Sequence, residues 1–238
     1  MTGSGRKAAK KRSLIVWIAL LLPALGLSFL LNRTIRENAI GAPGYTPLRD
    51  DAIARRYAPI LDPGAFGSAE RLLYRMARGP EGNLHVVYHF IWPGETNDGP
   101  GLLPLLNRMV YSGGLHLQKT IFGPGDIELV QLEINATGQV TRVRFETPDG
   151  HDAADFSVRH RTVELSDRAF PARSLLRVVS WNHLFEYVDG AVPGDSYQQL
   201  EPAYFDRELW EHYEMFKLRE TFLARNRAHA DFERIAVD

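Results

Sequence analysis

Residues 126–147, DIELVQLEINATGQVTRVRFET, alternate apolar and polar side chains on both sides of a short turn. In the first half, Val130, Leu132 and Ile134 fall on one face of an extended chain, with Gln131 and Glu133 on the other. The segment Asn135-Ala136-Thr137-Gly138 carries the turn signals. This pattern predicts an antiparallel hairpin with strands at 126–134 and 139–147.

The same two-residue period continues on both sides of this hairpin. Arg71–Ala77 and Leu84–Trp92 flank the turn at 79–83 and predict a second hairpin, and Phe156–Leu165 and Leu175–Trp181 are further strand-like runs. Short strands separated by turn signals are typical of an antiparallel sheet or sandwich rather than a parallel sheet with regular helical crossovers. We therefore predict an α+β fold built on an antiparallel, sandwich-like β domain.

Three helices are expected beside these strands. Thr46-Pro47 has the residues of a helix start, and that helix should stop before Pro59. Leu102–Tyr111 is a short apolar helix that contains a proline. Tyr204–Arg234 repeats aromatic and aliphatic residues every three or four positions, which predicts a long C-terminal amphipathic helix. Its apolar stripe can pack on the sheet or dock a partner, and both interpretations stay open.

The N-terminus carries an uncharged apolar run at Ser13–Leu31, directly after a cluster of bases. Its 19 residues form about 28 Å of helix, close to the ~30 Å hydrocarbon thickness of a bilayer. The bases belong on the cytoplasmic side, which places the rest of the chain outside the cytoplasm, in the periplasm or the extracellular space. A cleaved signal peptide is the alternative, with Ala39–Ala42 as the cleavage region. The expected location is the inner (cytoplasmic) membrane of a bacterium.

This topology divides the chain into a basic tail (1–12), a transmembrane signal anchor (13–32), a tether (33–46) and a folded domain (47–238). Five of the 28 bases and none of the 29 acids precede residue 33, so the remainder has a net charge of −6. That balance argues against nucleic acid as a partner. The chain has no cysteine, so disulfides, thiolate metal sites and cysteine nucleophiles are excluded.

Asp126 and Glu128 are the most conspicuous candidate site residues. Strand alternation places both carboxylates on the same face as the apolar residues of 130–134. Buried acids need a compensating partner, and oxygen ligands suit a hard cation such as Mg²⁺ or Ca²⁺. Ion pairing with basic side chains would also compensate the two carboxylates, and exposure beyond the edge of the sheet would make compensation unnecessary.

The segment FGPGDIELVQLEINATGQV, residues 122–140, resembles the glycine-rich loop, Asp-x-Glu pair and hairpin of necrosis- and ethylene-inducing-like proteins and related vacuolar-sorting-type β-sandwich proteins. In the necrosis-inducing family the motif reads G-H-R-H-D-W-E. Gly123, Asp126 and Glu128 match it, whereas a proline, a glycine and an isoleucine occupy other motif positions. Looser similarities occur at 56–60 and 180–183. The resemblance implies a β-sandwich fold and a divalent cation at the two acids.

The histidines give no metal motif by spacing. His85 and His89 would face each other on a helix, but on a strand they lie about 13 Å apart and cannot share a cation. His116, His151, His160 and His183 have no neighbouring ligand at a diagnostic spacing, although convergence in space with Asp126 and Glu128 would create a site. Serine-nucleophile, phosphate-loop and dinucleotide motifs are absent from the sequence.

These observations favour a binding protein over an enzyme. We expect a membrane-anchored accessory or scaffold subunit of a membrane protein assembly, which binds a membrane-protein partner and is held in the lipid bilayer by residues 13–31. Trp181, Trp210 and Tyr213 are the expected partner-binding residues because aromatic anchors dominate many interfaces. The alternative is a divalent-metal-dependent binding protein or hydrolase centred on Asp126 and Glu128, with Mg²⁺ or Ca²⁺ as cofactor.

Overall fold

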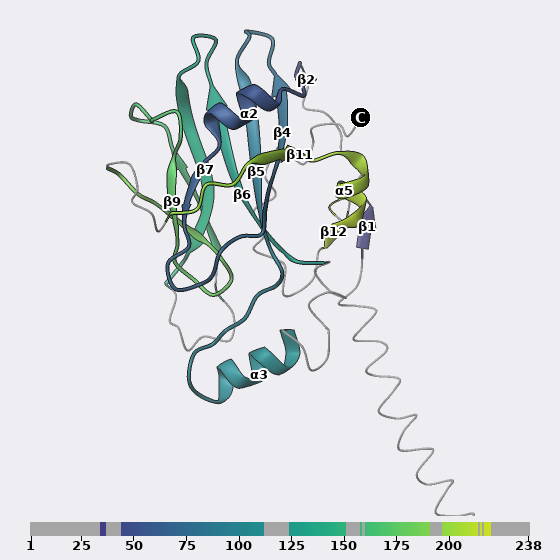
Figure 1. The fold of residues 1–238 in the computed structure, drawn as a ribbon, viewed down its shortest axis with the longest axis vertical. Helices are drawn as coiled ribbons and strands as arrows, with labels where there is room; N and C mark the ends of the chain where they lie inside the picture. Colours follow the sequence, from purple (N-terminus) through teal and green to yellow (C-terminus); the bar gives the residue numbers. More distant parts are fainter. Residues whose placement is uncertain are drawn as a thin grey trace, which may run out of the picture.

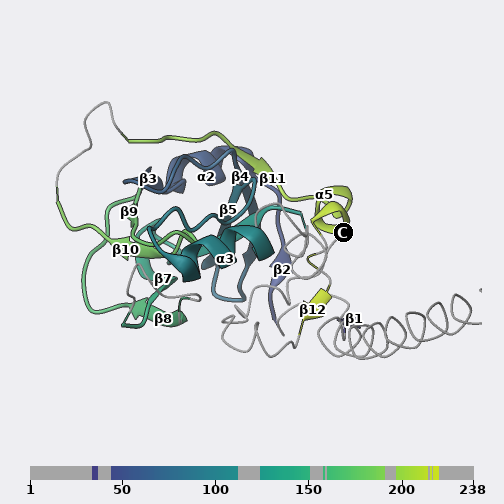
Figure 2. The same cartoon turned by 90° about the horizontal axis from the view of Figure 1, so that it is seen from below.

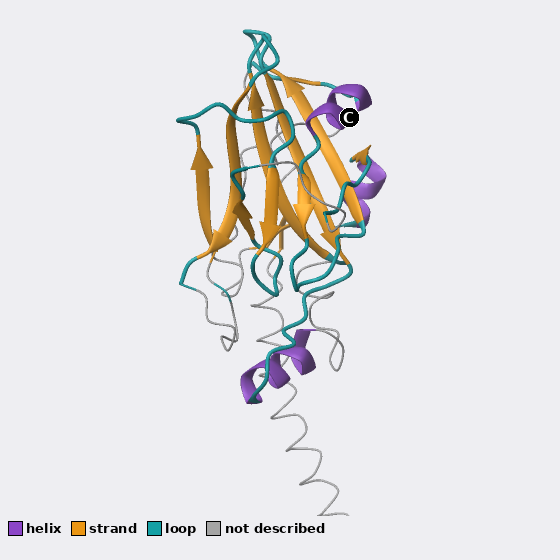
Figure 3. Ribbon diagram, turned by 60° about the vertical axis from the view of Figure 1, so that its left-hand side comes forward, coloured by secondary structure: helices purple, strands orange, loops and turns teal. Residues whose placement is uncertain are grey.

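A computed structural model of the chain describes residues 34–36, 44–111, 124–150, 158, 160–190, 197–213, 215 and 217–219. It is a mostly antiparallel β structure with few helices (Figure 1). A large twisted sheet forms one layer, and a small sheet and a helix form the layer against its inner face (Figure 3). The predicted β-rich, sandwich-like domain is confirmed at this level.

The large sheet has the strand order β11-β4-β5-β6-β7-β8, and β2 also pairs with β4. Every pairing is antiparallel except that of β11 with β4. Both predicted hairpins are present, as β4–β5 and β6–β7. The strands are β2 (Thr46–Pro47), β4 (Arg71–Arg78), β5 (Leu84–Trp92), β6 (Asp126–Ile134), β7 (Val140–Pro148), β8 (His160–Leu165) and β11 (Pro202–Tyr204).

The inner face of this sheet carries the main hydrophobic core. Helix α2 (Asp51–Tyr57) and the sheet of β3 (Ile60–Asp62), β9 (Leu175–Val178) and β10 (Phe185–Tyr187) cover it. The Tyr88 hydroxyl donates to the carbonyl of Ala54, 2.7 Å away, and so ties β5 to α2. Burial raises the pKa of this phenol, because the charged form would lie in the core.

The outer face of β4 and β5 is also covered, by the segment that follows β11. Leu73, Ile91, Phe205, Trp210 and Tyr213 form a second cluster, named the outer core below. Helix α5 (Arg207–His212) carries Trp210 and ends where Tyr213 begins a turn. The residues His85, Val87, His89 and Ile91 thus lie on a face that is largely buried as well.

The prediction of a long C-terminal helix from Tyr204 is wrong for the residues that the structure describes. Tyr204 ends strand β11, α5 spans six residues, and Lys217–Arg219 is strand β12, paired with β1 (Thr34–Arg36). The aromatic residues of this segment instead lie on strand β11, helix α5 and the turn after it, and Phe205, Trp210 and Tyr213 pack in the outer core. Residues 220–234 lie outside the described part of the chain, and β1 falls within the expected tether.

The first expected helix begins later than its sequence suggested. Thr46-Pro47 pairs with β4, and the helix starts at Asp51, where the Asp50 carboxylate accepts from the amides of Ala52 and Ile53. A charged N-cap with two amide partners fixes this start better than Thr46 would. Helix α3 (Leu102–Tyr111) agrees with the expectation and lies below the ends of the strands (Figures 1 and 2).

Within the described ranges, no helix is long and apolar enough to cross a membrane. The predicted anchor at 13–31 lies outside those ranges.

Candidate functional site

Asp126 and Glu128 lie on the inner face at the lower end of the large sheet, as the alternation predicted. They pair with Trp92 and Phe90 of β5, and their exposed fractions are 1% and 8%. Gly125 precedes them with φ +78°, and a Cβ there would lie 2.8 Å from the carbonyl oxygen of Trp92. A glycine at this position therefore lets the chain enter β6 directly beside the end of β5.

The Asp126 carboxylate is paired with His183. The distance from Oδ2 to the His183 Nδ1 is 2.6 Å, and both side chains are buried. The other ring nitrogen, Nε2, lies 3.3 Å from the carbonyl oxygen of Phe66. A carboxylate and a carbonyl both accept hydrogen bonds, so each ring nitrogen of His183 faces an acceptor. The imidazole is thus the hydrogen-bond partner of the buried Asp126 carboxylate.

His183 is also conformationally unusual. Its φ is +58°, and it is the residue other than glycine with positive φ in the described chain. Such a backbone conformation costs about 1–3 kcal/mol and tends to occur at functional sites. The imidazole stacks on Trp92, with ring centroids 4.3 Å apart and planes within 8°. The Trp92 Nε1 in turn donates to the carbonyl of Gly67 at 3.1 Å.

A chain of hydrogen bonds holds the turn that carries His183. Glu146 Oε2 lies 2.6 Å from His160 Nδ1, and His160 Nε2 lies 3.0 Å from Asn182 Nδ2. The Asn182 Oδ1 accepts from the Ser180 hydroxyl, which itself accepts from the amide of Leu184. This order requires a proton on His160 Nδ1 and a lone pair on Nε2. The network joins the turn to β7 and β8 and fixes its strained shape.

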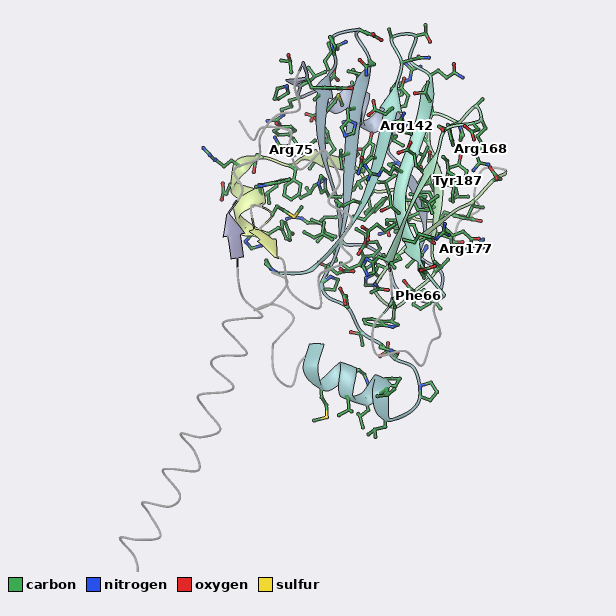
Figure 4. The ribbon with its side chains drawn as sticks, turned by 180° about the vertical axis from the view of Figure 1, so that it is seen from behind. Phe66, Arg75, Arg142, Arg168, Arg177 and Tyr187 are labelled. Carbon is green, nitrogen blue, oxygen red and sulfur yellow. The ribbon has the colours of Figure 1, made fainter. Side chains whose placement is uncertain are left out.

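A cavity of about 520 Å³ lies beside this pair, at the same end of the sheet. Residues 65–68, 92–94, 96–99 and two members of the His183 turn contribute its lining, and Phe66 of this wall is labelled in Figure 4. We call it the Trp92–His183 pocket. Trp181 also lines it, and among the described residues its buried indole N–H has no hydrogen-bond acceptor. The pocket thus has three aromatic side chains, Phe66, Trp92 and Trp181, in its walls.

The structure separates the predicted site residues into two places. Asp126, Glu128 and Trp181 lie at the pocket end of the inner face, whereas Trp210 and Tyr213 are buried in the outer core with exposed fractions of 3% and 9%. The partner-binding role of the three aromatic residues stays a prediction, and their burial leaves little of each for a partner. Sequence reasoning missed His183 as the companion of Asp126, because the two are 57 positions apart.

The metal prediction keeps one supporting observation. The second oxygen of Asp126, Oδ1, is buried and has no hydrogen-bond partner among the described residues. Against it, these same residues contain no group of three or more His, Asp or Glu side chains that could hold a cation. His85 and His89 do not form a pair: His85 Nδ1 lies 2.5 Å from Glu133 Oε1, and His89 is in the outer face of β5. His116 and His151 lie outside the described ranges.

Comparison with known proteins gives no relative: no protein-family model, no curated protein and no solved structure matches this chain. The resemblance of residues 122–140 to necrosis-inducing β-sandwich proteins therefore stays an expectation from the motif.

Proposed function

We propose that this protein is an accessory subunit of a membrane assembly, anchored through residues 13–31, and that its extracytoplasmic β domain binds a segment of a membrane-protein partner in the Trp92–His183 pocket. The observation that carries the proposal is the pocket itself. Its wall includes His183, which has a positive φ and is hydrogen-bonded to the buried Asp126 behind it, and a purely structural turn does not need this strain. The aromatic lining of Phe66, Trp92 and Trp181 favours an occupant with apolar side chains, such as a segment of a partner protein.

Binding fits the chemistry of this site better than acid–base catalysis by His183. Both ring nitrogens of His183 face acceptors within the protein, so the ring presents no lone pair to the cavity. The pocket is built from three segments that are distant in sequence, residues 65–68, 92–99 and the His183 turn. Pre-formed concave sites with aromatic walls and a few polar groups are the usual form of binding pockets.

The test compares tagged full-length chains extracted in mild detergent, with mass spectrometry of the proteins that stay bound. Ala65 and Thr96 line the pocket and are exposed, so Ala65→Trp and Thr96→Trp fill its mouth without altering the core. Ala136→Trp places the same side chain on the exposed turn between β6 and β7 as a control.

We expect the wild type and Ala136→Trp to retain one partner at fixed stoichiometry and both pocket variants to lose it. A wild-type chain recovered alone contradicts the accessory role. A partner that survives both pocket substitutions contradicts the pocket as its binding site.

The unpartnered Oδ1 of Asp126 favours a second candidate, a divalent cation site at Asp126 and Glu128. A cation at 100 times its dissociation constant stabilises a fold by about 2.7 kcal/mol, which is about 5–10 °C in melting temperature for a chain of this size. Mg²⁺ and Ca²⁺ should then each be tested for a shift that Asp126→Asn abolishes and Asp149→Asn, an exposed control, keeps. Equal melting temperatures with and without the cations rule this candidate out.

A further inference from the structure

Helix α3 presents a large apolar surface to solvent. Its leucines Leu102, Leu103, Leu105 and Leu106 and Met109 are 40–70% exposed, and they are the exposed large hydrophobic side chains of the described chain. At 100° per residue these five positions occupy an arc of about 160° on one side of the helix. The helix contains no acidic residue. Such a patch marks an interaction surface rather than a free surface.

The opposite side of α3 is held by the protein. Pro104 is buried, and the Arg108 guanidinium donates from Nη1 to the carbonyl oxygens of Asn97 at 2.6 Å and Gly99 at 3.1 Å. These bonds fix the rotation of the helix against the loop that lines the pocket. Because Arg108 and Pro104 hold the other side of the helix, the apolar arc faces away from the loop to which Arg108 is hydrogen-bonded.

We propose that this apolar arc lies in the interface of a lipid bilayer, the one that holds the anchor at 13–31. The inference rests on the membrane anchor of the proposed function. Three residues of chain separate the end of the predicted anchor, Leu31, from Thr34, the first residue of β1, and a connection of this length spans at most about 10 Å. Figure 1 shows β1 beside the lower half of the sheet and α3 below the strand ends. The bilayer surface is therefore within reach of the end of the molecule that carries α3.

The chemistry of α3 suits a lipid surface. An interfacial helix buries its apolar face about 5–10 Å into the boundary between headgroups and acyl chains. Helix α3 has this amphipathic pattern, with four leucines and a methionine on one arc and one arginine on the other side. The pocket shares its loop with Arg108, so this docking places the pocket mouth close to the membrane surface, where a segment of a membrane-protein partner would enter.

The chain has no cysteine, so single-cysteine labelling of the full-length protein is free of background. Leu105→Cys and Met109→Cys, and Ala136→Cys as a control, are labelled with an environment-sensitive fluorophore. Each is reconstituted in vesicles of phosphatidylethanolamine and phosphatidylglycerol, with or without doxyl nitroxide on the acyl chains. Flotation of the vesicles first establishes that the chain is anchored.

We expect the probes at positions 105 and 109 to lose most of their fluorescence to the acyl-chain nitroxide, and the probe at 136 to lose none. Solvent-like emission at 105 and 109 in anchored protein overturns the inference and leaves the anchor intact. Apolar emission without quenching overturns it too, because protein rather than lipid then covers the helix. A chain that does not float with the vesicles contradicts the anchor, and with it the ground for the inference.

Discussion

His183 and His89 are both buried, on opposite faces of the large sheet, and their companions have opposite charge. His183, 4% exposed, faces the carboxylate of Asp126 beside an open pocket. His89, fully buried, lies among Phe205, Trp210 and the guanidinium of Arg75 in the outer core. Burial and the neighbouring Arg75 lower the pKa of His89 to about 3, so this ring is neutral.

The difference separates packing from candidate function. The neutral His89 fills space between aromatic rings and takes part in a closely packed cluster. His183 brings backbone strain and a hydrogen bond to a buried carboxylate to the wall of a cavity, and the strain needs a compensating role. The predictions below test whether the two regions differ in the way this comparison implies.

The largest effect is expected in the outer core. Trp210 contacts Phe205 and His89 and lies under the Arg75 guanidinium, whose Cζ is 4.9 Å from the indole ring. Trp210→Ala leaves a cavity and a buried cation without its aromatic neighbour, which should lower the free energy of unfolding by about 3–5 kcal/mol. Chemical denaturation of the full chain measures it. Glu208→Ala, an exposed change in the same helix, should fall within about 0.5 kcal/mol of the wild type.

Removing the hydrogen-bond partner of His183 should have the next largest effect. Asp126→Ala leaves Nδ1 of the buried His183 imidazole without its hydrogen-bond partner, and an unsatisfied buried polar group costs about 1–3 kcal/mol. The double variant with His183→Ala should lose less than the sum of the two single variants, because both single variants already remove the same hydrogen bond. Additive losses would mean that the two side chains do not act as a pair.

His89 should make stability depend on pH. Its pKa is near 3 in the folded protein and 6.5 in the unfolded chain. Below pH 6.5, His89 therefore binds a proton in the unfolded state but stays unprotonated in the folded state until the pH approaches 3. The free energy of unfolding consequently falls as the pH decreases. Between pH 7.5 and pH 5 this amounts to about 2 kcal/mol. Comparison of denaturation curves for wild type and His89→Gln isolates the contribution, and identical pH slopes for the two proteins would contradict it.

The smallest effect concerns the backbone of the pocket turn. His183→Gly and His183→Ala both remove the imidazole, but only glycine adopts φ +58° without steric strain. The glycine variant should therefore be more stable than the alanine variant by about 1 kcal/mol. Equal unfolding midpoints would show that the turn relaxes to a negative φ when the ring is lost.

Much of the fold followed from local pattern. Alternation in residues 71–92 and 126–147 determined both hairpins and put Asp126 and Glu128 on the buried face, because side chains in a strand alternate strictly between faces. The apolar run at 102–111 identified α3. Spacing failed in the C-terminal region, where a helical period in the sequence is used by a turn, a short helix and strand β12. Tertiary packing on the outer core overrides the local helical preference there.

The candidate site could be predicted only in part, for a physical reason. Sequence alone required that two buried acids have a compensating partner, because an uncompensated buried charge is costly. It could not choose between a cation, an arginine pair and exposure, since that choice depends on which distant loop meets the strand end. The tertiary structure brings His183 onto Asp126, stacks it on Trp92 and leaves a cavity beside them. Burial and the apolar period are local properties of a chain, whereas a pair between residues 57 positions apart exists only once the chain has folded.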